Sequence, residues 1–343
     1  MRSQWLNALA VLASVLAGTL IVVANAERPA AHYLFNVSYD PTRELYRDLN
    51  RLFEGKYEGE HGSGVAIRQS HGGSSLQARR VASGEDSPDV VTLGLPSDVM
   101  AIQNRGLIAE NWRDRLPNHS RPYYSTIVFV VRKGNPHRVR DWPDLVKGEI
   151  SVIVPDPKSS GNGKLAALAA WGAAVLRGAS ESEAREFLRA FYAHAPFLLP
   201  AARAAADAFS LEKQGDVHVA WENEALREVD ASRGALEIVY PPVSILAEPS
   251  VAWVDANVDK HHSEPLARAY LEFLFSEEAQ EVMARNGYRP VDEAVARRHA
   301  KRLPPIELFS IERIAQDWPD AQRKFFGESG IIDAVYTLKP RAE

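Results

Sequence analysis

The sequence predicts an α/β fold, in which buried strands and helices alternate along most of the chain. Short β-branched runs at residues 65–69 and 150–154 each lead into a turn of small residues and then into a helix-forming segment. This alternation indicates largely parallel sheets. The chain has 343 residues, a length that favours two lobes over a single core.

The first residues form a segment that is distinct from the fold. Arg2 precedes an almost unbroken apolar run at residues 8–23, and Ala24-Asn25-Ala26 fits the small-x-small cleavage pattern. An uncleaved membrane anchor is the alternative, because the run approaches the ~20 residues that span a bilayer. The cleavage pattern favours a signal peptide at residues 1–26, cleaved after Ala26. Since the chain has no cysteine, it has no lipid-anchored cysteine and no disulfide, and such an exported chain is expected in the periplasm.

The first predicted strand is the buried apolar run at residues 33–37. Asp40 and Pro41 suit the N-cap and the first position of a helix at residues 42–53. Residues 54–64 are polar and contain glycine, which predicts a loop. The next elements are strands at residues 65–69 and 89–93, helices at 76–83 and 96–104, and a polar connection at 112–122.

The second half of the sequence begins with a continuous apolar strand at residues 126–132, which suits the middle of a sheet or a crossing between lobes. Residues 201–209 are small and carry no pattern of their own. The other predicted strands are residues 150–154, 217–221, 236–240 and 250–254. The predicted helices are residues 142–146, 165–176, 181–192, 222–229, 266–275, 277–286, 291–301 and 318–326.

Four places put donor groups at the carboxyl ends of predicted strands, where βα loops converge and ligands bind. Asp40, Ser74 and the run Ser160-Gly161-Asn162 lie at helix starts, whose unpaired N–H groups and positive dipole end suit an anion. Trp221 ends a strand and offers an indole N–H, which only donates. Each place has a plain alternative, because small polar residues also cap helices and a buried tryptophan also bonds to a carbonyl in the core.

Asp40 has two interpretations with opposite consequences. As an N-cap, its carboxylate is occupied and only its backbone faces a ligand. As a free acceptor, the carboxylate would favour a ligand that carries a proton, such as hydrogen phosphate. Pro41 directly after it favours the cap.

Enzymatic function finds little support in the sequence. His71 lies close to Ser74 and Ser75, which suggests a nucleophile with a base, but no adjacent carboxylate orients the histidine. Residues 158–164 end in Gly-Lys but lack the first glycine and the final Ser/Thr of a P-loop.

Metal and nucleic-acid binding are also disfavoured. His218, His261 and His262 do not have the spacing of metal ligands. The net charge is −5, and no run rich in lysine and arginine suggests a nucleic-acid partner. Arg203 and Lys164 are the basic groups nearest the candidate loops. The alternative to a role beside a ligand is that each side chain is solvated or paired with a neighbouring carboxylate.

Six segments, in order and at natural spacing, carry a resemblance to a known family. They are NVSYDPTREL at residues 36–45, RQSHGGS at 68–74, STIVFVVRKGNP at 125–136, PKSSG at 157–161, AWENEAL at 220–226 and ILAEP at 245–249. Together they resemble the periplasmic sulfate/thiosulfate-binding proteins of ABC importers. The similarity extends over nearly the whole mature chain.

The resemblance implies a type II periplasmic binding protein, in which each of two lobes has a mostly parallel sheet flanked by helices and the ligand lies between the lobes. We expect residues 31–122 plus 246–302 in lobe 1, residues 123–245 in lobe 2, and residues 303–343 as a C-terminal segment that packs on the lobes.

The resemblance also implies a set of neutral ligand donors. These are the backbone of Asp40, Ser74, the hydroxyl of Ser160, the N–H groups of Gly161 and Asn162, the backbone of Ala202 and the indole of Trp221, with Arg203 and His71 beside them. No metal or cofactor is expected. Asn162, Ala201 and Ala204 stand where the family usually has glycines, so Asn162 and the turn around Ala202 depart from the family pattern.

The implied function is capture of sulfate or thiosulfate and delivery to a membrane ABC permease, by a monomer that catalyses no reaction. A fully ionised sulfate needs only donors, whereas a protonated phosphate would leave its O–H without an acceptor. The alternatives are a binder of another tetrahedral oxyanion, such as molybdate or phosphate, and an exported hydrolase of phosphate or sulfate esters.

Overall fold

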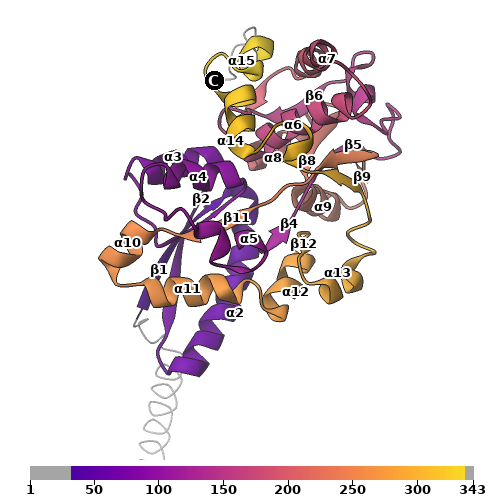
Figure 1. Ribbon diagram of the computed structural model, residues 1–343. Helices are drawn as coiled ribbons and strands as arrows, with labels where there is room; N and C mark the ends of the chain where they lie inside the picture. Colours follow the sequence, from indigo (N-terminus) through magenta and orange to yellow (C-terminus); the bar gives the residue numbers. More distant parts are fainter. Residues whose placement is uncertain (1–31, 337–343) are drawn as a thin grey trace, which may run out of the picture.

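The computed structural model of this chain describes residues 32–336. The predicted signal peptide at residues 1–26 lies outside the described residues. Within them, strands and helices alternate as the sequence predicts, and they build two separate main sheets (Figure 1). None of the helices in residues 32–336 combines the length and the apolar content needed to cross a bilayer.

The first sheet has the order β11-β3-β1-β2. In it, β1 is parallel to β2 and β3, and β11 is antiparallel to β3. We call the part of the chain built on this sheet the first lobe. Its strands are β1 (His32–Tyr39), β2 (Val65–Gly72), β3 (Val90–Leu93) and β11 (Ser250–Trp253), and its helices are α2 (Arg43–His61), α3 (Ser74–Ala82), α4 (Pro96–Gln103), α10 (Asp255–His261) and α11 (Glu264–Phe273), with the 3₁₀ turn η1 (Asp40–Thr42) before α2.

The second sheet has the order β7-β6-β8-β5-β9, and the part built on it is the second lobe. β6 is parallel to β7 and β8, whereas β5 is antiparallel to β8 and β9. Its strands are β5 (Ile127–Arg132), β6 (Val152–Pro155), β7 (Leu198–Leu199), β8 (Val217–Trp221) and β9 (Leu236–Val239), and its helices are η3 (Trp142–Val146), α6 (Gly161–Val175), α7 (Glu181–Ala193), α8 (Ala202–Ser210) and α9 (Glu222–Ala231). Both sheets are therefore mixed, and in the second lobe antiparallel pairing is as frequent as parallel pairing.

Short crossover segments join the lobes. β4 (Tyr123–Tyr124) pairs antiparallel with β12 (Arg289–Pro290), and Ser125 bridges Ala247. Figure 1 shows β4 and β12 between the two groups of elements. The remaining elements are η2 (Trp112–Asp114), α5 (Pro117–Ser120), β10 (Val243–Ile245), α12 (Glu277–Arg285) and α13 (Glu293–His299).

The C-terminal segment runs back over both lobes. β13 (Glu307–Phe309) pairs with β10, α14 contacts α4, and α15 contacts α7. It also contains η4 (Ile311–Arg313), α14 (Trp318–Ala321), η5 (Gln322–Phe326) and α15 (Ile331–Tyr336). The domain boundaries given above remain a prediction.

One sequence prediction of local structure is wrong. Residues 54–64 are not a loop, because α2 continues to His61 and stops at Gly62, whose φ of 68° is a left-handed helix cap. Aromatic contacts at i,i+4 spacing extend this helix, with ring centroids 5.6 Å apart for Phe53–Tyr57 and 4.1 Å for Tyr57–His61. Residues 201–209, where the sequence carries no pattern, contain most of α8, which buries an alanine face together with Phe209.

Candidate functional site

All seven predicted ligand donors are buried at the ends of strands or the starts of helices. Ser74 and Gly161 are the first residues of α3 and α6, Ala202 is the first residue of α8, and Trp221 ends β8. The first N–H groups of a helix have no acceptor within the helix, so α3, α6 and α8 each present unpaired donors there. The buried set is Asp40, Ser74, Ser160, Gly161, Asn162, Ala202 and Trp221.

The structure brings the starts of α3 and α6 together across the lobes. A Cβ added to Gly161 would lie 3.3 Å from the Cβ of Ser74, and a Cβ added to Gly73 would lie 2.5 Å from the carbonyl oxygen of Ser159. Backbone approach this close requires glycine at position 73. The β2–α3 turn of the first lobe therefore packs directly on the β6–α6 turn of the second.

Asp40 and Trp221 join the same region from opposite lobes. The N–H of Arg203, next to Ala202, donates to Asp40 Oδ2 at 3.1 Å. The rings of Tyr39 and Trp221 lie 5.5 Å apart. Among residues 32–336, the indole N–H of Trp221 has no hydrogen-bond acceptor, although the residue is only 1% exposed. In the described residues, the Trp221 indole therefore does not donate to a core carbonyl, which was the alternative interpretation of this residue.

Ser160 caps a helix, which was the alternative to anion binding at this position. Its oxygen accepts from the N–H of Gly163 at 3.5 Å, which makes it the N-cap of α6. In the described part of the chain, the hydroxyl hydrogen of Ser160 has no acceptor, so capping and donation to a ligand are compatible in one residue.

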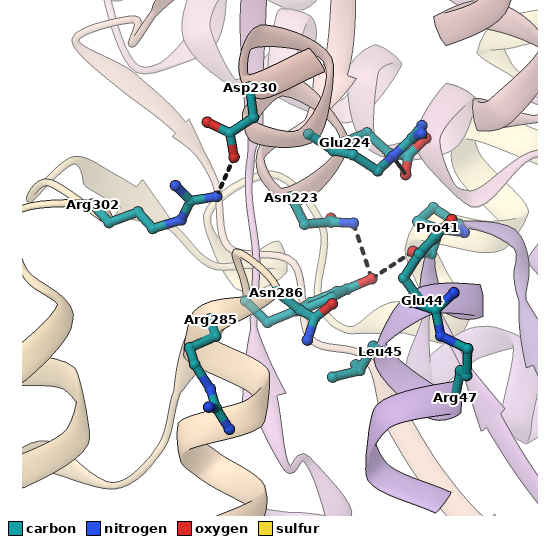
Figure 2. A pocket seen from close by; sticks show the side chains of 12 residues that line it. Pro41, Glu44, Leu45, Arg47, Asn223, Glu224, Asp230, Arg285, Asn286 and Arg302 are labelled. Atoms are coloured by element: carbon teal, nitrogen blue, oxygen red, sulfur yellow. Dashed lines mark hydrogen bonds and ion pairs between the residues drawn. The ribbon is translucent and has the colours of Figure 1, made fainter. Parts of the chain in front are cut away.

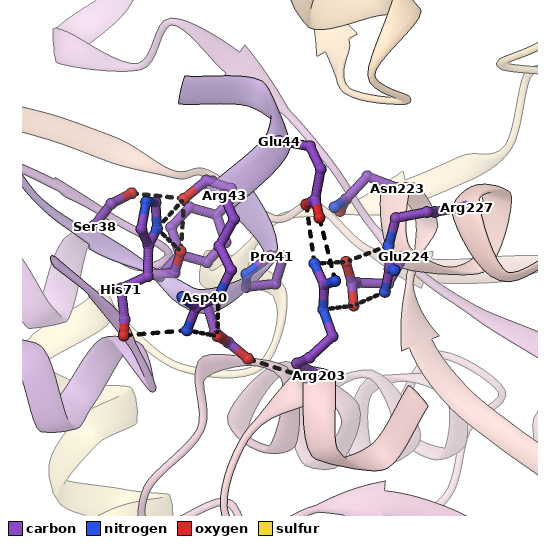
Figure 3. A network of polar contacts seen from close by, with 12 residues as sticks. Ser38, Asp40, Pro41, Arg43, Glu44, His71, Arg203, Asn223, Glu224 and Arg227 are labelled. Carbon is purple, nitrogen blue, oxygen red and sulfur yellow. Dashed lines mark hydrogen bonds and ion pairs between the residues drawn. The ribbon is translucent and has the colours of Figure 1, made fainter. Parts of the chain in front are cut away.

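Asp40 is not the helix N-cap that Pro41 favours. The cap position before η1 is Tyr39, and no side chain caps it. Instead, Asp40 Oδ1 accepts from Arg43 at 2.7 and 3.1 Å while Oδ2 accepts from the Arg203 N–H (Figure 3). The carboxylate is not a free acceptor either, because protein donors occupy both of its oxygens.

Arg203 lies next to the predicted donor Ala202 and joins both lobes. Its guanidinium donates to Glu44 of α2 at 2.9 and 3.2 Å and lies 3.5 Å from Glu224 of α9. Burial raises the pKa of Glu44, but the hydrogen bonds and charge of Arg203 lower it more, so the net pKa is below its ordinary value. Burial dominates for Glu224 and raises its pKa, even though Arg227 and Arg203 face it.

His71 is held by groups other than serine. Its Nε2 lies 2.9 Å from Gln69 Oε1, and its Nδ1 lies 3.4 Å from the carbonyl oxygen of Tyr39. Burial lowers the pKa of His71 below its ordinary value, which favours the neutral ring near pH 7. The hydroxyls of Ser74 and Ser75 both donate to Asp98 rather than to His71. The serine–histidine arrangement of a nucleophile with its base is therefore not formed.

The departures from the family pattern do not distort the backbone. Asn162 lies in the first turn of α6, Ala201 is the N-cap of α8 and Ala204 lies in its first turn, and none of the three has a positive φ. Their N–H groups remain at helix starts without a glycine. The side chain of Asn162 turns toward β8, where it donates to the carbonyl of Val219 at 3.2 Å.

A pocket of about 260 Å³ lies close to this region but is a different feature (Figure 2). It opens between α2, α9 and α12, and none of the seven predicted donors lines it. On its wall, Tyr288 accepts from Asn223 and donates to the carbonyl of Pro41, both at 2.9 Å. Within residues 32–336, no cluster of His, Asp and Glu has the arrangement of a metal site.

Sequence reasoning missed Asp98, Arg43 and Glu44 as partners of the site. Asp98 lies on α4 and receives the hydroxyls of Ser74 and Ser75, yet it is 24 residues from Ser74 in sequence. No local pattern marks such a contact. The i,i+3 spacing of Asp40 and Arg43 was a signal that could have identified their ion pair.

Comparison with known proteins decides the family. The model of the bacterial extracellular solute-binding protein family matches residues 35–289. The sulfate-binding protein of Salmonella typhimurium is 45% identical over 319 residues, which cover 92% of this chain and 97% of that protein. The thiosulfate-binding protein of Pseudomonas aeruginosa is 42% identical over 327 residues, covering 95% and 98%. The chain belongs to the sulfate/thiosulfate-binding protein family.

The solved structures agree with this family assignment. The sulfate-binding protein SubI from Mycobacterium tuberculosis superimposes with a TM-score of 0.78 at 28% identity, covering 86% of this chain and 99% of SubI. The resemblance drawn from six sequence segments is thus confirmed, and so is the two-lobed type II α/β fold class.

Proposed function

We propose that this chain captures sulfate or thiosulfate between its lobes and holds the dianion with neutral donors. The observation that carries the proposal is that the starts of α3 and α6 pack on each other, while Asp40 contacts the start of α8 and the adjacent Tyr39 contacts Trp221. Helix N-termini and fixed N–H dipoles stabilise an anion without a countercharge. The names of the relatives support the same ligands.

The carboxylates around the site favour a fully ionised ligand. Arg43 and the Arg203 N–H occupy Asp40, while Ser74, Ser75 and Lys164 occupy Asp98. A ligand O–H would find neither carboxylate free, and an unpaired buried O–H costs about 1–3 kcal/mol. This argument supports sulfate and thiosulfate over hydrogen phosphate; molybdate, which also needs only donors, stays a second candidate.

The proposal extends to the role of the protein in the cell. The chain is exported to the periplasm with residues 1–26 removed, acts as a monomer that catalyses no reaction, and delivers its ligand to a membrane ABC permease. Ligand binding draws the lobes together, and the permease recognises the closed form. The family's solute-binding role and the serine hydroxyls committed to Asp98 support binding rather than ester hydrolysis.

Calorimetric titration of the chain without residues 1–26 tests this function. We expect saturable one-to-one binding of sulfate, thiosulfate or both, with no heat from phosphate. Molybdate is the comparison for size. Tight phosphate binding without sulfate or thiosulfate binding contradicts the proposal, and turnover of a sulfate or phosphate ester contradicts the assignment as a non-enzyme.

A further inference from the structure

A buried ion pair joins the two lobes beside the candidate site. Lys164 Nζ of α6 lies 3.4 Å from Asp98 Oδ1 of α4, and the two residues are 5% and 3% exposed. The hydroxyls of Ser74 and Ser75 donate to the same carboxylate at 2.6 and 2.9 Å. Three donors thus converge on Asp98, two from the first lobe and one from the second.

The pair lies where the two anion-facing helices begin. Lys164 is in the first turn of α6, which starts at Gly161, and Ser74 is the first residue of α3. α4 packs on β3 and β11 of the first sheet, whereas α6 packs on β6 and β8 of the second. Asp98 therefore ties the start of α3 to the start of α6, and this contact exists only while the lobes are together.

Asp98 also fixes how Ser74 meets a ligand. Ser74 Oγ donates to Asp98 and accepts from the N–H of Gly94 at 3.0 Å. Its hydroxyl hydrogen is used within the protein, so the donor that Ser74 offers is its backbone N–H. The carboxylate positions that N–H by holding the first residue of α3.

Lys164 has further contacts that hold it in place. Its Nζ donates to Gln322 Oε1 at 3.0 Å and lies 5.4 Å from the ring centroid of Phe326. Both residues belong to η5 of the C-terminal segment. A buried charge that loses its partner is strongly unfavourable. The ion pair therefore opposes separation of the lobes until water reaches both charges.

We propose that Asp98 and Lys164 are positioning residues of the binding site, which hold the starts of α3 and α6 against the bound dianion and so slow its release. This inference rests on the proposed function, because it needs an anion bound between these helices. Neither residue touches the ligand. Their pair adds to the lifetime of the closed form rather than to the rate of encounter.

Stopped-flow tryptophan fluorescence with sulfate and thiosulfate tests this role. In Lys164→Met, we expect dissociation to accelerate by about tenfold or more, while association changes little, because truncating a buried charge pair acts on the dissociation rate. Lys164→Arg keeps the charge and is expected to restore most of the slow release. Arg177→Met is the matched control, since Arg177 pairs with Asp141 inside the second lobe, and it should release ligand like the wild type.

Thermal unfolding without ligand separates positioning from stability. If Lys164→Met folds poorly, the double variant Asp98→Asn/Lys164→Met removes both charges and should fold while still releasing ligand faster. A wild-type dissociation rate in a folded Lys164→Met or in the double variant, whatever its melting temperature, overturns the inference. If the wild-type chain binds neither anion, the proposed function fails first, and the inference fails with it.

Discussion

At the scale of single residues, the proposed site contains a few residues whose polar atoms bind other protein groups as well as offering donors to a ligand. Ser160 caps α6 with its oxygen, and among residues 32–336 its hydroxyl hydrogen has no acceptor. Asp40 contributes a carboxylate whose two oxygens bind Arg43 and the Arg203 N–H. The residues nearest the proposed anion thus present donors and withhold acceptors, which is the chemistry that a dianion without protons requires.

Trp221→Phe tests the most specific single donor. The change removes one N–H and keeps the aromatic contact with Tyr39, whose ring lies 5.5 Å away. A hydrogen bond to a charged group contributes about 1.5–3 kcal/mol, so we expect the Kd for sulfate to rise roughly ten- to hundredfold. Calorimetry measures the change.

Trp142→Phe is the control for that substitution. Trp142 is also buried, but its indole donates to the carbonyl of Val243 in the second lobe. This variant should lose some stability and keep the wild-type Kd. Equal affinities of Trp221→Phe and the wild type would remove Trp221 from the site.

At the scale of elements, the proposed donors lie at three helix starts and one strand end, and ion pairs join the helices around them. Arg203 of α8 reaches Glu44 of α2 in the other lobe. Gly73 lets the β2–α3 turn approach the Ser159 carbonyl to a distance that a side chain would prevent. Packing between elements, rather than any one loop, therefore brings the proposed donors together.

The Arg203–Glu44 contact predicts a pH dependence. The pKa of Glu44 is lowered from its ordinary 4.5. A carboxylate with a lowered pKa stabilises the folded state above its ordinary pKa, and that contribution disappears as pH falls through the lowered value. Glu44→Gln should therefore be less stable than the wild type at pH 7, by no more than about 1 kcal/mol because Glu44 is partly exposed, and the difference should shrink steadily as the pH falls below 4.5.

Melting temperatures of both proteins from pH 3 to pH 8 measure this difference. Glu293→Gln serves as the control, since Glu293 pairs with Arg297 on an exposed surface and should show almost no effect at any pH. A gap between Glu44→Gln and the wild type that widens toward acid would contradict the assignment.

At the scale of the whole molecule, two lobes meet at several points and share only short crossovers. β4 pairs with β12, and Ser125 bridges Ala247. Tyr288 also joins the lobes, through Asn223 of α9 and the carbonyl of Pro41. Short crossovers of this kind are hinges that allow rigid lobes to close on a ligand.

Closure is measurable in solution. We expect the radius of gyration from X-ray scattering to decrease when sulfate is added to the ligand-free chain, because the described contacts between α3 and α6 require adjacent lobes. Addition of chloride at equal ionic strength is the control and should change nothing. An unchanged radius at saturating sulfate would show that binding and closure are not coupled.

Much of the fold was predictable because its signals are local. The strand at residues 65–69, the helix from Pro96 and the turn before α6 all follow from short apolar runs, capping residues and glycines. The loop predicted at residues 54–64 failed because the aromatic contacts of Tyr57 outweigh a polar composition. The direction of β5 could not be predicted, because a buried strand has the same continuous apolar sequence in parallel and antiparallel sheets.

Short stretches of sequence are enough to predict the alternation of strands and helices, the family, and the order of the proposed donors Asp40, Ser74, Gly161 and Trp221 along the chain. These depend on neighbouring residues or on motifs in register. The partners of the charged groups, in contrast, follow from packing: Asp40 binds Arg43 and Arg203, and Asp98 joins Ser74 to Lys164 across the lobes. The physical reason is separation, because Asp98 and Lys164 are 66 residues apart and only packing of the two lobes brings their charges together.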